Sequence, residues 1–126
     1  MINHISFGVR DIPRAKAFYD AALKPLGYRC TSASEGSLGY GTDTATTLWV
    51  QKAASPVPPD EASGLHVCLD APTRKSVDAF HKAGLRAGGR DNGKPDLRES
   101  YGPNYYAAFV IDPDGYRLEA YCSAAE

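Results

Sequence analysis

The chain contains an internal repeat, which constrains its possible folds more than any other feature of the sequence. The stretch Ile2–Val9 alternates apolar and polar residues. The stretch Gly64–Ala71 shows the same alternation 62 residues later, with a histidine at the third position of both stretches. The offset continues further along the chain, where Phe18 is matched by Phe80. The chain of 126 residues is therefore predicted to contain two copies of one unit.

Each copy is predicted to form a strand, a helix and three further strands. The first helix is expected to begin after Asp11, a good N-cap residue, and to end at Gly27, while the second is expected to begin at Thr73 and to end near Gly84. The remaining strands are predicted over 28–33, 38–41 and 46–52 in the first copy, and over 87–90, 105–111 and 116–122 in the second. Residues 91–102 are predicted to form a polar loop.

Two βαβββ units predict an α+β fold, because each amphipathic helix must cover one face of its own sheet. The opposite face of each sheet is free to curve around a cleft, which predicts a partly open barrel. The length suits a single domain, with the first repeat at 1–53, a proline-containing linker at 54–63 and the second repeat at 64–122.

Composition excludes several classes of function. Fourteen basic and fifteen acidic residues give a net charge of −1, so no basic surface for nucleic acid or an anionic membrane is expected. The sequence has no apolar run near the roughly 20 residues of a spanning helix and no signal-peptide pattern. The three cysteines form no CxxC pair, and Cys68 and Cys122 are interpreted as small buried hydrophobes. These features predict a cytoplasmic protein.

Strand periodicity indicates which polar side chains share the uncovered face. Because side chains alternate across a strand, the apolar set of the first strand is expected under the helix, with His4 on the opposite face. The same parity places His66 and Glu119 on the uncovered face of the second sheet. Two imidazoles and one carboxylate are a common ligand set for Zn, Ni, Fe, Mn or Co, with open positions for substrate. The sequence therefore predicts one divalent metal ion bound by these three residues.

The chain resembles the vicinal oxygen chelate superfamily, which includes glyoxalase I, extradiol dioxygenases and bleomycin-resistance proteins. The resemblance covers nearly the whole chain, and the segments that carry it are Asn3–Ile5, Ala17–Tyr19, Leu65–Val67 and, most specifically, Phe109–Glu119. It implies a glyoxalase-like fold and a homodimer. It also implies that His4, His66 and Glu119 bind the metal and that Glu119 is catalytic.

One position departs from glyoxalase I, which has a further acidic metal ligand at the end of its first unit. Trp49 stands at that position, and an indole can neither bind a metal nor accept a proton. The departure argues against the two-base glyoxalase mechanism. Residues expected to line the pocket for a small-molecule substrate are Ser6, Trp49, Gln51, Arg90, Tyr101 and Tyr121.

Two functions remain open at this point. The first is a metal-dependent lyase or dioxygenase, in which a small substrate chelates the metal through vicinal oxygens. The alternative is a non-enzymatic drug-binding protein of the bleomycin-resistance type, whose relatives use this fold without a metal. The three intact ligand positions favour the enzyme, whereas the flat indole of Trp49 favours the binding protein.

Overall fold

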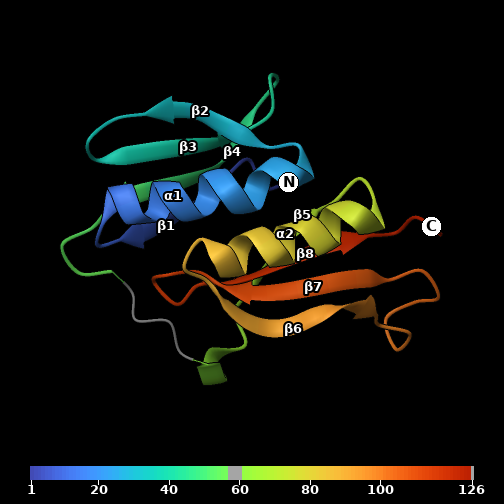
Figure 1. The fold of residues 1–126 in the computed structure, drawn as a ribbon. Helices are drawn as coiled ribbons and strands as arrows, with labels where there is room; N and C mark the ends of the chain where they lie inside the picture. The colour runs from blue at the N-terminus through green and yellow to red at the C-terminus, as the bar shows by residue number, and fades with distance from the viewer. Residues whose placement is uncertain (57–60, 126) are drawn as a thin grey trace.

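The computed structural model of the protein describes residues 1–56 and 61–125 (Figure 1). The first unit comprises β1 (Ile5–Val9), α1 (Ile12–Leu23), the short 3-10 helix η1 (Lys24–Leu26), β2 (Arg29–Ala33), β3 (Ser37–Gly41) and β4 (Thr46–Lys52). After the 3-10 turn η2 (Glu61–Ser63), the second unit comprises β5 (Val67–Asp70), α2 (Arg74–Arg86), β6 (Arg90–Leu97), β7 (Tyr106–Ile111) and β8 (Arg117–Cys122). The predicted α+β fold with two βαβββ units is confirmed.

Both helices begin at side-chain caps that the sequence indicated. Asp11 accepts a hydrogen bond from the backbone N–H of Arg14 at 3.0 Å, and Pro13 occupies the first turn of α1. Thr73 and Ser76 form a reciprocal capping box at the start of α2. The second helix continues to Arg86, two residues beyond the predicted end at Gly84, because a glycine inside a helix weakens it without stopping it.

Each unit forms its own four-stranded sheet, and the two sheets have equivalent topologies. The strand orders are β1-β4-β3-β2 and β5-β8-β7-β6. In both sheets the first strand pairs in parallel with the last, with Ile5 opposite Leu48 in one sheet and Val67 opposite Leu118 in the other. This shared register is the structural counterpart of the repeat in the sequence.

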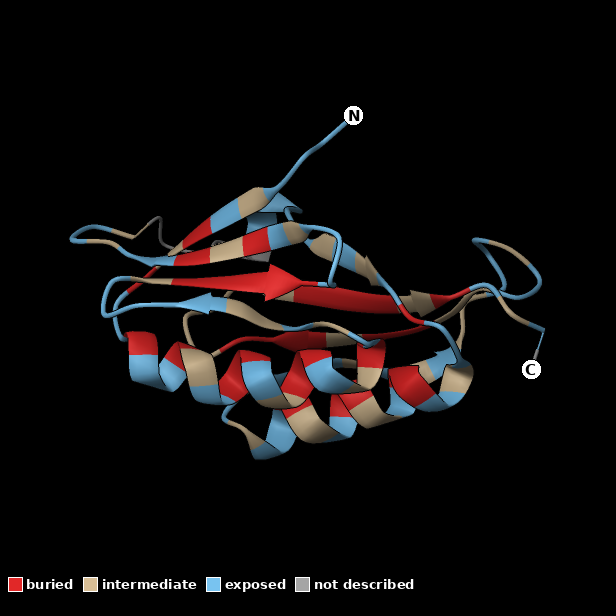
Figure 2. Cartoon of the chain, turned by 90° about the horizontal axis from the view of Figure 1, so that it is seen from above, coloured by how far each residue is buried: buried red, intermediate tan, exposed pale blue. Residues whose placement is uncertain are grey.

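The two helices lie side by side on one face of the molecule and cover both sheets from the same side (Figures 1 and 2). The core fills the space between the helices and the sheets, with Phe7, Val50, Val110 and Leu118 among its buried residues. Within residues 1–56 and 61–125, no helix lies over the opposite sheet faces, in agreement with the predicted partly open barrel. Leu65, which the alternation assigned to the apolar set, is 69% exposed because it precedes the first residue of β5.

The segment after α2 differs from the expectation. Residues 87–90 were expected as a short strand and 91–102 as a loop, but β6 runs from Arg90 to Leu97. This edge strand contains Gly93 and Pro95, and its register with β7 shifts on both sides of Gly93. An edge strand with register shifts needs little apolar alternation, so its sequence resembles a loop.

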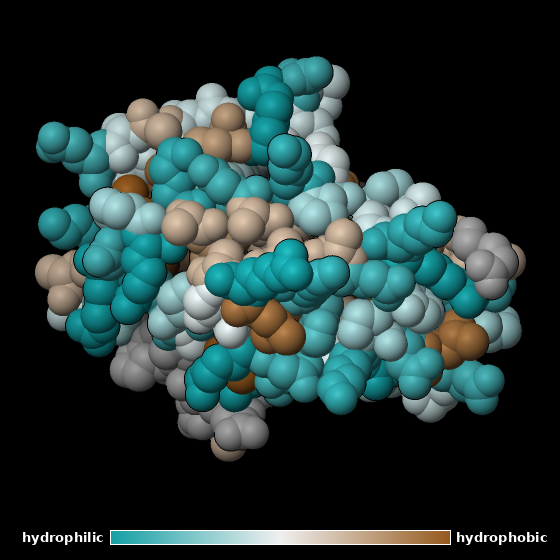
Figure 3. Space-filling model, viewed as in Figure 1, coloured by the Kyte–Doolittle hydropathy of each residue, from teal (hydrophilic) through white to brown (hydrophobic). Residues whose placement is uncertain are grey.

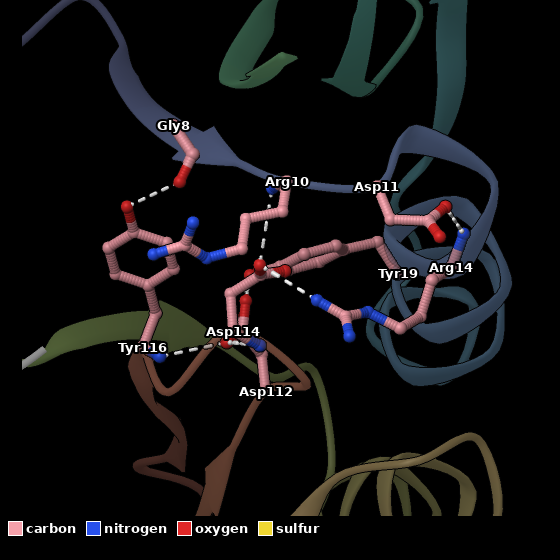
Figure 4. Close-up of polar contacts among 8 residues, drawn as sticks. All are labelled: Gly8, Arg10, Asp11, Arg14, Tyr19, Asp112, Asp114 and Tyr116. Carbon is pink, nitrogen blue, oxygen red and sulfur yellow. Dashed lines mark hydrogen bonds and ion pairs between the residues drawn. The ribbon is translucent and has the colours of Figure 1, made fainter. Parts of the chain in front are cut away.

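A polar seam joins the first unit to the turn between β7 and β8 (Figure 4). Asp112 accepts a hydrogen bond from the hydroxyl of Tyr19 at 2.5 Å, and Asp114 forms an ion pair with Arg14 at 3.0 Å. The hydroxyl of Tyr116 donates to the carbonyl of Gly8 at 2.6 Å, and its ring stacks on Phe7 with centroids 4.4 Å apart. These contacts hold the two units in a defined relative position.

The predicted linker 54–63 lies partly outside the described residues, since 57–60 belong to it. The boundaries of the two repeats and of this linker stay predictions. Within the described ranges, neither helix combines the length and hydropathy of a membrane-spanning segment.

Candidate metal and substrate site

Glu119 and His66 form a hydrogen-bonded pair on the uncovered face of the second sheet. Glu119 lies in β8 between Leu118 and Ala120, whose side chains pack in the helix-covered core, so its own side chain points to the other face. It is nevertheless only 3% exposed. The Nε2 atom of His66, one residue before β5, lies 2.9 Å from Oε2 of Glu119. A nitrogen and an oxygen donor for a metal are thus brought together by two neighbouring strands.

A tyrosine holds the other oxygen of the same carboxylate. The hydroxyl of Tyr105 donates to Oε1 of Glu119 at 2.7 Å. The Tyr105 ring stacks on Tyr121 with centroids 4.0 Å apart, and Tyr101 contacts it edge-on at 5.2 Å. Burial and the nearby carboxylate raise the pKa of Tyr105, so its hydroxyl stays protonated and keeps donating. Tyr105 precedes β7 and reaches the site only through the fold, so no local sequence signal marks it as a site residue.

Cys68 lies on the same face, directly opposite Glu119 in the β5–β8 register. Its side chain is exposed, so the interpretation of Cys68 as a buried hydrophobe is wrong, while Cys122 is buried as expected. Desolvation and the negative charge of Glu119 raise the pKa of the Cys68 thiol to about 12. The thiol is therefore neutral near pH 7.

His4 belongs to the other sheet and does not join this pair. It lies just before β1, is exposed, and its ring bonds to Oδ1 of the neighbouring Asn3 at 2.8 Å. In the part of the chain that the structure describes, no three His, Cys, Asp or Glu side chains are close enough to hold one metal ion. A single chain therefore brings together His66 and Glu119 but leaves His4 apart from them.

Three of the predicted substrate-binding residues lie on the uncovered face of the first sheet. Ser6 pairs with Trp49 across the β1–β4 register, and Gln51 lies two residues further along β4. The flanking Leu48 and Val50 are buried in the core, which leaves the indole of Trp49 on the open face. Its ring covers Gly39 so closely that an added Cβ there would lie 2.9 Å from Cζ3.

The other predicted substrate-binding residues belong to the second unit. Tyr121 and Tyr101 both contact Tyr105, beside Glu119. Arg90 begins β6 and pairs with Ile111, at the opposite end of the strand from Leu97. Arg98 and Arg117, which were not among the residues expected to line the pocket, line a cavity together with His66.

The comparisons with known proteins agree with this geometry. The family model of the Glyoxalase/Bleomycin resistance protein/Dioxygenase superfamily matches residues 1–120. A glyoxalase/bleomycin resistance protein from Albidiferax ferrireducens T118 is 28% identical, with a TM-score of 0.81 over 94% of this chain and 96% of that one. A glyoxalase-related enzyme from Fulvimarina pelagi is 17% identical, with a TM-score of 0.75 over 97% and 87% of the two chains. No curated protein matches the chain in sequence.

Two βαβββ units, with a histidine and a carboxylate side chain in contact on the uncovered sheet face, define a member of a glyoxalase-like class. The chain belongs to the Glyoxalase/Bleomycin resistance protein/Dioxygenase superfamily. The resemblance inferred from the segments around His4, His66 and Glu119 is thereby confirmed at the level of the family.

Proposed function

We propose that the protein is a divalent-metal-dependent enzyme of this superfamily that acts on a small substrate chelated through vicinal oxygens. One observation carries the proposal: the His66 imidazole and the Glu119 carboxylate meet at 2.9 Å on the uncovered sheet face. The donor set fits Zn, Ni, Fe, Mn or Co, since imidazole and carboxylate are ordinary ligands of all of them. When bound, the metal would polarise a substrate oxygen and stabilise the charge that develops on it.

The chain's own residues have distinct roles in this proposal. His66 and Glu119 would hold the metal, and Glu119 is also the proposed catalytic carboxylate, which accepts a proton from the substrate. Tyr105 fixes the orientation of Glu119 through the hydrogen bond to Oε1. The residues proposed to line the substrate pocket are Ser6, Trp49, Gln51, Arg90, Tyr101 and Tyr121.

The site becomes complete only if a second copy of the chain contributes to it. His4 and Trp49 belong to the first unit, and His66 and Glu119 belong to the second, whose sheet lies beside that of the first (Figure 1). We propose a homodimer in which the uncovered face of the first sheet of one subunit covers the second sheet of its partner. His4 then joins His66 and Glu119 across the interface. The three free cysteines favour a cytoplasmic location, because disulfides are rare there.

A non-enzymatic drug-binding protein of the bleomycin-resistance type remains the second candidate. Trp49 supports it, since its indole lies on the open face and offers a flat surface for a planar ligand. In that case a planar drug would quench Trp49 fluorescence equally well in metal-free and metal-loaded protein.

Metal analysis of protein purified without chelators tests the enzyme proposal. We expect bound divalent metal in the wild-type protein and loss of most of it in His4→Ala, His66→Ala and Glu119→Gln. Glu35→Gln, which changes an exposed carboxylate in the β2–β3 turn, is the matched control and should retain the metal. Wild-type protein that neither contains nor binds a divalent ion would contradict the proposal of a metal-dependent enzyme and would favour the drug-binding protein.

Activity toward a hemithioacetal separates the branches of the superfamily. With Trp49 in place of the second carboxylate, we expect poor isomerisation of the adduct of methylglyoxal and glutathione, because the two-base mechanism needs a carboxylate at both positions. Strong turnover would show that Glu119 alone can serve as the base.

A further inference from the structure

A cavity beside the candidate metal site is lined by cationic side chains. It has a volume of about 300 Å³ and is bounded by Gly64, Leu65, His66, Asn92, Gly93, Arg98, Phe109 and Arg117. Among the described residues, its lining includes two arginines and a histidine but no carboxylate. His66 connects this cavity to Glu119, because its ring lines the cavity and its Nε2 atom contacts the carboxylate.

Arg98 is held in place by an aromatic ring and a backbone carbonyl. Its guanidinium lies over the ring of Phe109, with Cζ 5.3 Å from the ring centroid, and its Nη2 atom donates to the carbonyl of Lys94 at 2.5 Å. Its Nε atom is buried and has no hydrogen-bond partner among the described residues. A buried donor without a partner is costly, which favours a ligand that accepts from it.

Arg117 supplies the second charge of the cavity. It lies in β8 two residues before Glu119, so both side chains belong to the uncovered face. It is half-buried, and within residues 1–56 and 61–125 neither Arg117 nor Arg98 forms an ion pair with an acidic side chain. Guanidinium groups match the geometry of carboxylate and phosphate oxygens, and they attract these anions most strongly where solvent is partly excluded.

Phe109 and Gly93 form a flat wall of the cavity. A Cβ atom at Gly93 would lie 2.8 Å from Cδ2 of Phe109 and 3.3 Å from Nη2 of Arg98, so a larger residue would displace both. Phe109, Gly93 and Gly64 contribute an apolar part of the cavity lining, and such a surface suits a planar apolar group. The cavity is at the small end of the range for ligand pockets.

Building on the proposed function, we propose that Arg98 and Arg117 bind the acidic group of the substrate, a small planar organic acid packed against Phe109. The recognised chemistry is an organic oxyanion, either a carboxylate or a phosphonate. With its acidic group in this cavity, the substrate places its adjoining part beside His66, facing Glu119. This arrangement specifies an acidic substrate rather than a neutral one.

Binding of simple acids to metal-free protein tests the proposal without relying on catalysis. The probes are benzoate, phenylphosphonate and the neutral isostere benzamide, titrated by calorimetry at low salt. We expect one or both acids to bind and benzamide not to bind, with the preferred acid identifying the carboxylate or the phosphonate. Arg98→Gln and Arg117→Gln should each weaken acid binding by about tenfold or more, and added salt should weaken it further.

The matched control is Arg86→Gln, which removes an exposed arginine from α2 on the opposite side of the molecule and should leave binding unchanged. If Arg98→Gln lowers the melting temperature too far for titration, Arg117→Gln and Arg98→Lys decide the outcome. Arg98→Lys keeps the charge but loses the forked donor geometry, so it should bind acids more weakly than wild type. Equal binding of benzamide and benzoate, unchanged binding in the arginine variants, or no binding of either acid would overturn the proposal.

Glu119→Gln separates this inference from the proposed function. That variant should lose the metal but still bind the acid, because its carboxylate is not part of the cavity lining. Wild-type protein that binds benzoate through Arg98 and Arg117 yet never binds metal would leave the anion site intact while contradicting the metalloenzyme. Metal binding without acid binding would support the metalloenzyme while contradicting the anion site.

Discussion

Glu119 is a buried carboxylate in which each oxygen has a different protein partner. Oε2 faces His66, while Oε1 accepts from Tyr105. A metal ion could replace the contact with His66 without disturbing the bond from Tyr105. Tyr105 is therefore a positioning residue, which keeps the carboxylate in one orientation while the other oxygen is free to bind.

Removing the hydroxyl of Tyr105 should weaken metal binding without changing the fold. Outer partners of metal ligands typically affect affinity by about 10–100-fold, and we expect a loss in this range for Tyr105→Phe. Titration with a fluorescent metal competitor measures the effect. The matched control is Tyr101→Phe, whose hydroxyl does not contact Glu119, and its metal affinity should equal that of wild type. Equal affinities for both variants would contradict the positioning role.

Asp112 makes stability depend on pH. Burial raises the pKa of its carboxyl above the ordinary value, and the hydrogen bonds from Tyr19 and two backbone amides lower it only in part. The folded protein therefore binds this proton more tightly than the unfolded chain does. The stabilising contribution is complete below the unfolded pKa and is lost as the pH rises through the folded pKa.

Asp112→Asn should remove this dependence, because an amide does not titrate in this range. We expect the wild-type protein to gain stability relative to the variant as the pH falls from 7 toward about 4. Urea unfolding at several pH values measures the difference. Asp43→Asn, which changes an exposed carboxylate, is the control. A difference between wild type and Asp112→Asn that grows with rising pH would have the wrong sign and contradict this account.

Among the elements, those with strong local signals were predicted well and the edge strand was not. Side-chain caps, helical periodicity and β-branched alternation depend on neighbours in sequence, so both helices and β4 were placed within a few residues. Most of β6 was expected to be a loop, because its own residues show little strand pattern. The segment is a strand because it pairs with β7, and the sequence of β6 alone does not indicate that pairing. Backbone pairing with β7, rather than the side chains of β6, therefore determines this strand.

Gly89 connects α2 to β6 where the backbone passes close to α1. An added Cβ would lie 2.7 Å from Cε1 of Phe18 and 2.8 Å from the carbonyl oxygen of Gly84. Gly89→Ala should therefore destabilise the protein by about 1–3 kcal/mol, as measured by urea unfolding. At Gly36 in the β2–β3 turn, no atom of the described residues lies within 4 Å of such a Cβ, so Gly36→Ala should change stability by less than about 1 kcal/mol. Equal stability of the two variants would show that the contact at Gly89 relaxes freely.

At the scale of the whole molecule, the candidate site could be predicted only in part. Alternation placed His66 and Glu119 on one face, because parity along a strand is a local property. The bond from Tyr105 and the pairing of Arg98 with Arg117 around one cavity depend on how loops and strands meet in space. Parity along one strand could not place His4 relative to His66 and Glu119, since their separation depends on how the two sheets lie relative to each other.

The proposed homodimer can be tested by its mass in solution and by the fluorescence of Trp49. Sedimentation at micromolar concentration should give about twice the chain mass of 13.5 kDa. Trp49 is the single tryptophan of the chain and lies on the face that the partner would cover. Its emission should shift to longer wavelength as the protein is diluted and the dimer dissociates. A monomer of constant emission would contradict the shared site and the role of His4 in it.

The helix side of the molecule shows a different surface. Figure 3 shows this side, where weakly apolar side chains gather between charged ones. A groove there is lined by Ala21, Pro25, Ala79, Lys82, Ala83, Arg86 and Ala87, from both helices and the segments that follow them. The dimer proposed above would leave this groove exposed, because it uses the opposite side of both sheets.

The seam between the units has a consequence for the order of events during protein synthesis. Its contacts join residues that are 93, 100 and 108 positions apart, so they cannot form until the turn between β7 and β8 has been made. The first unit emerges from the ribosome long before that turn. Meanwhile Tyr19 lacks its carboxylate partner and Phe7 lacks the ring that stacks on it. We therefore expect the half-synthesised chain to be more prone to aggregation and chaperone binding than the complete one.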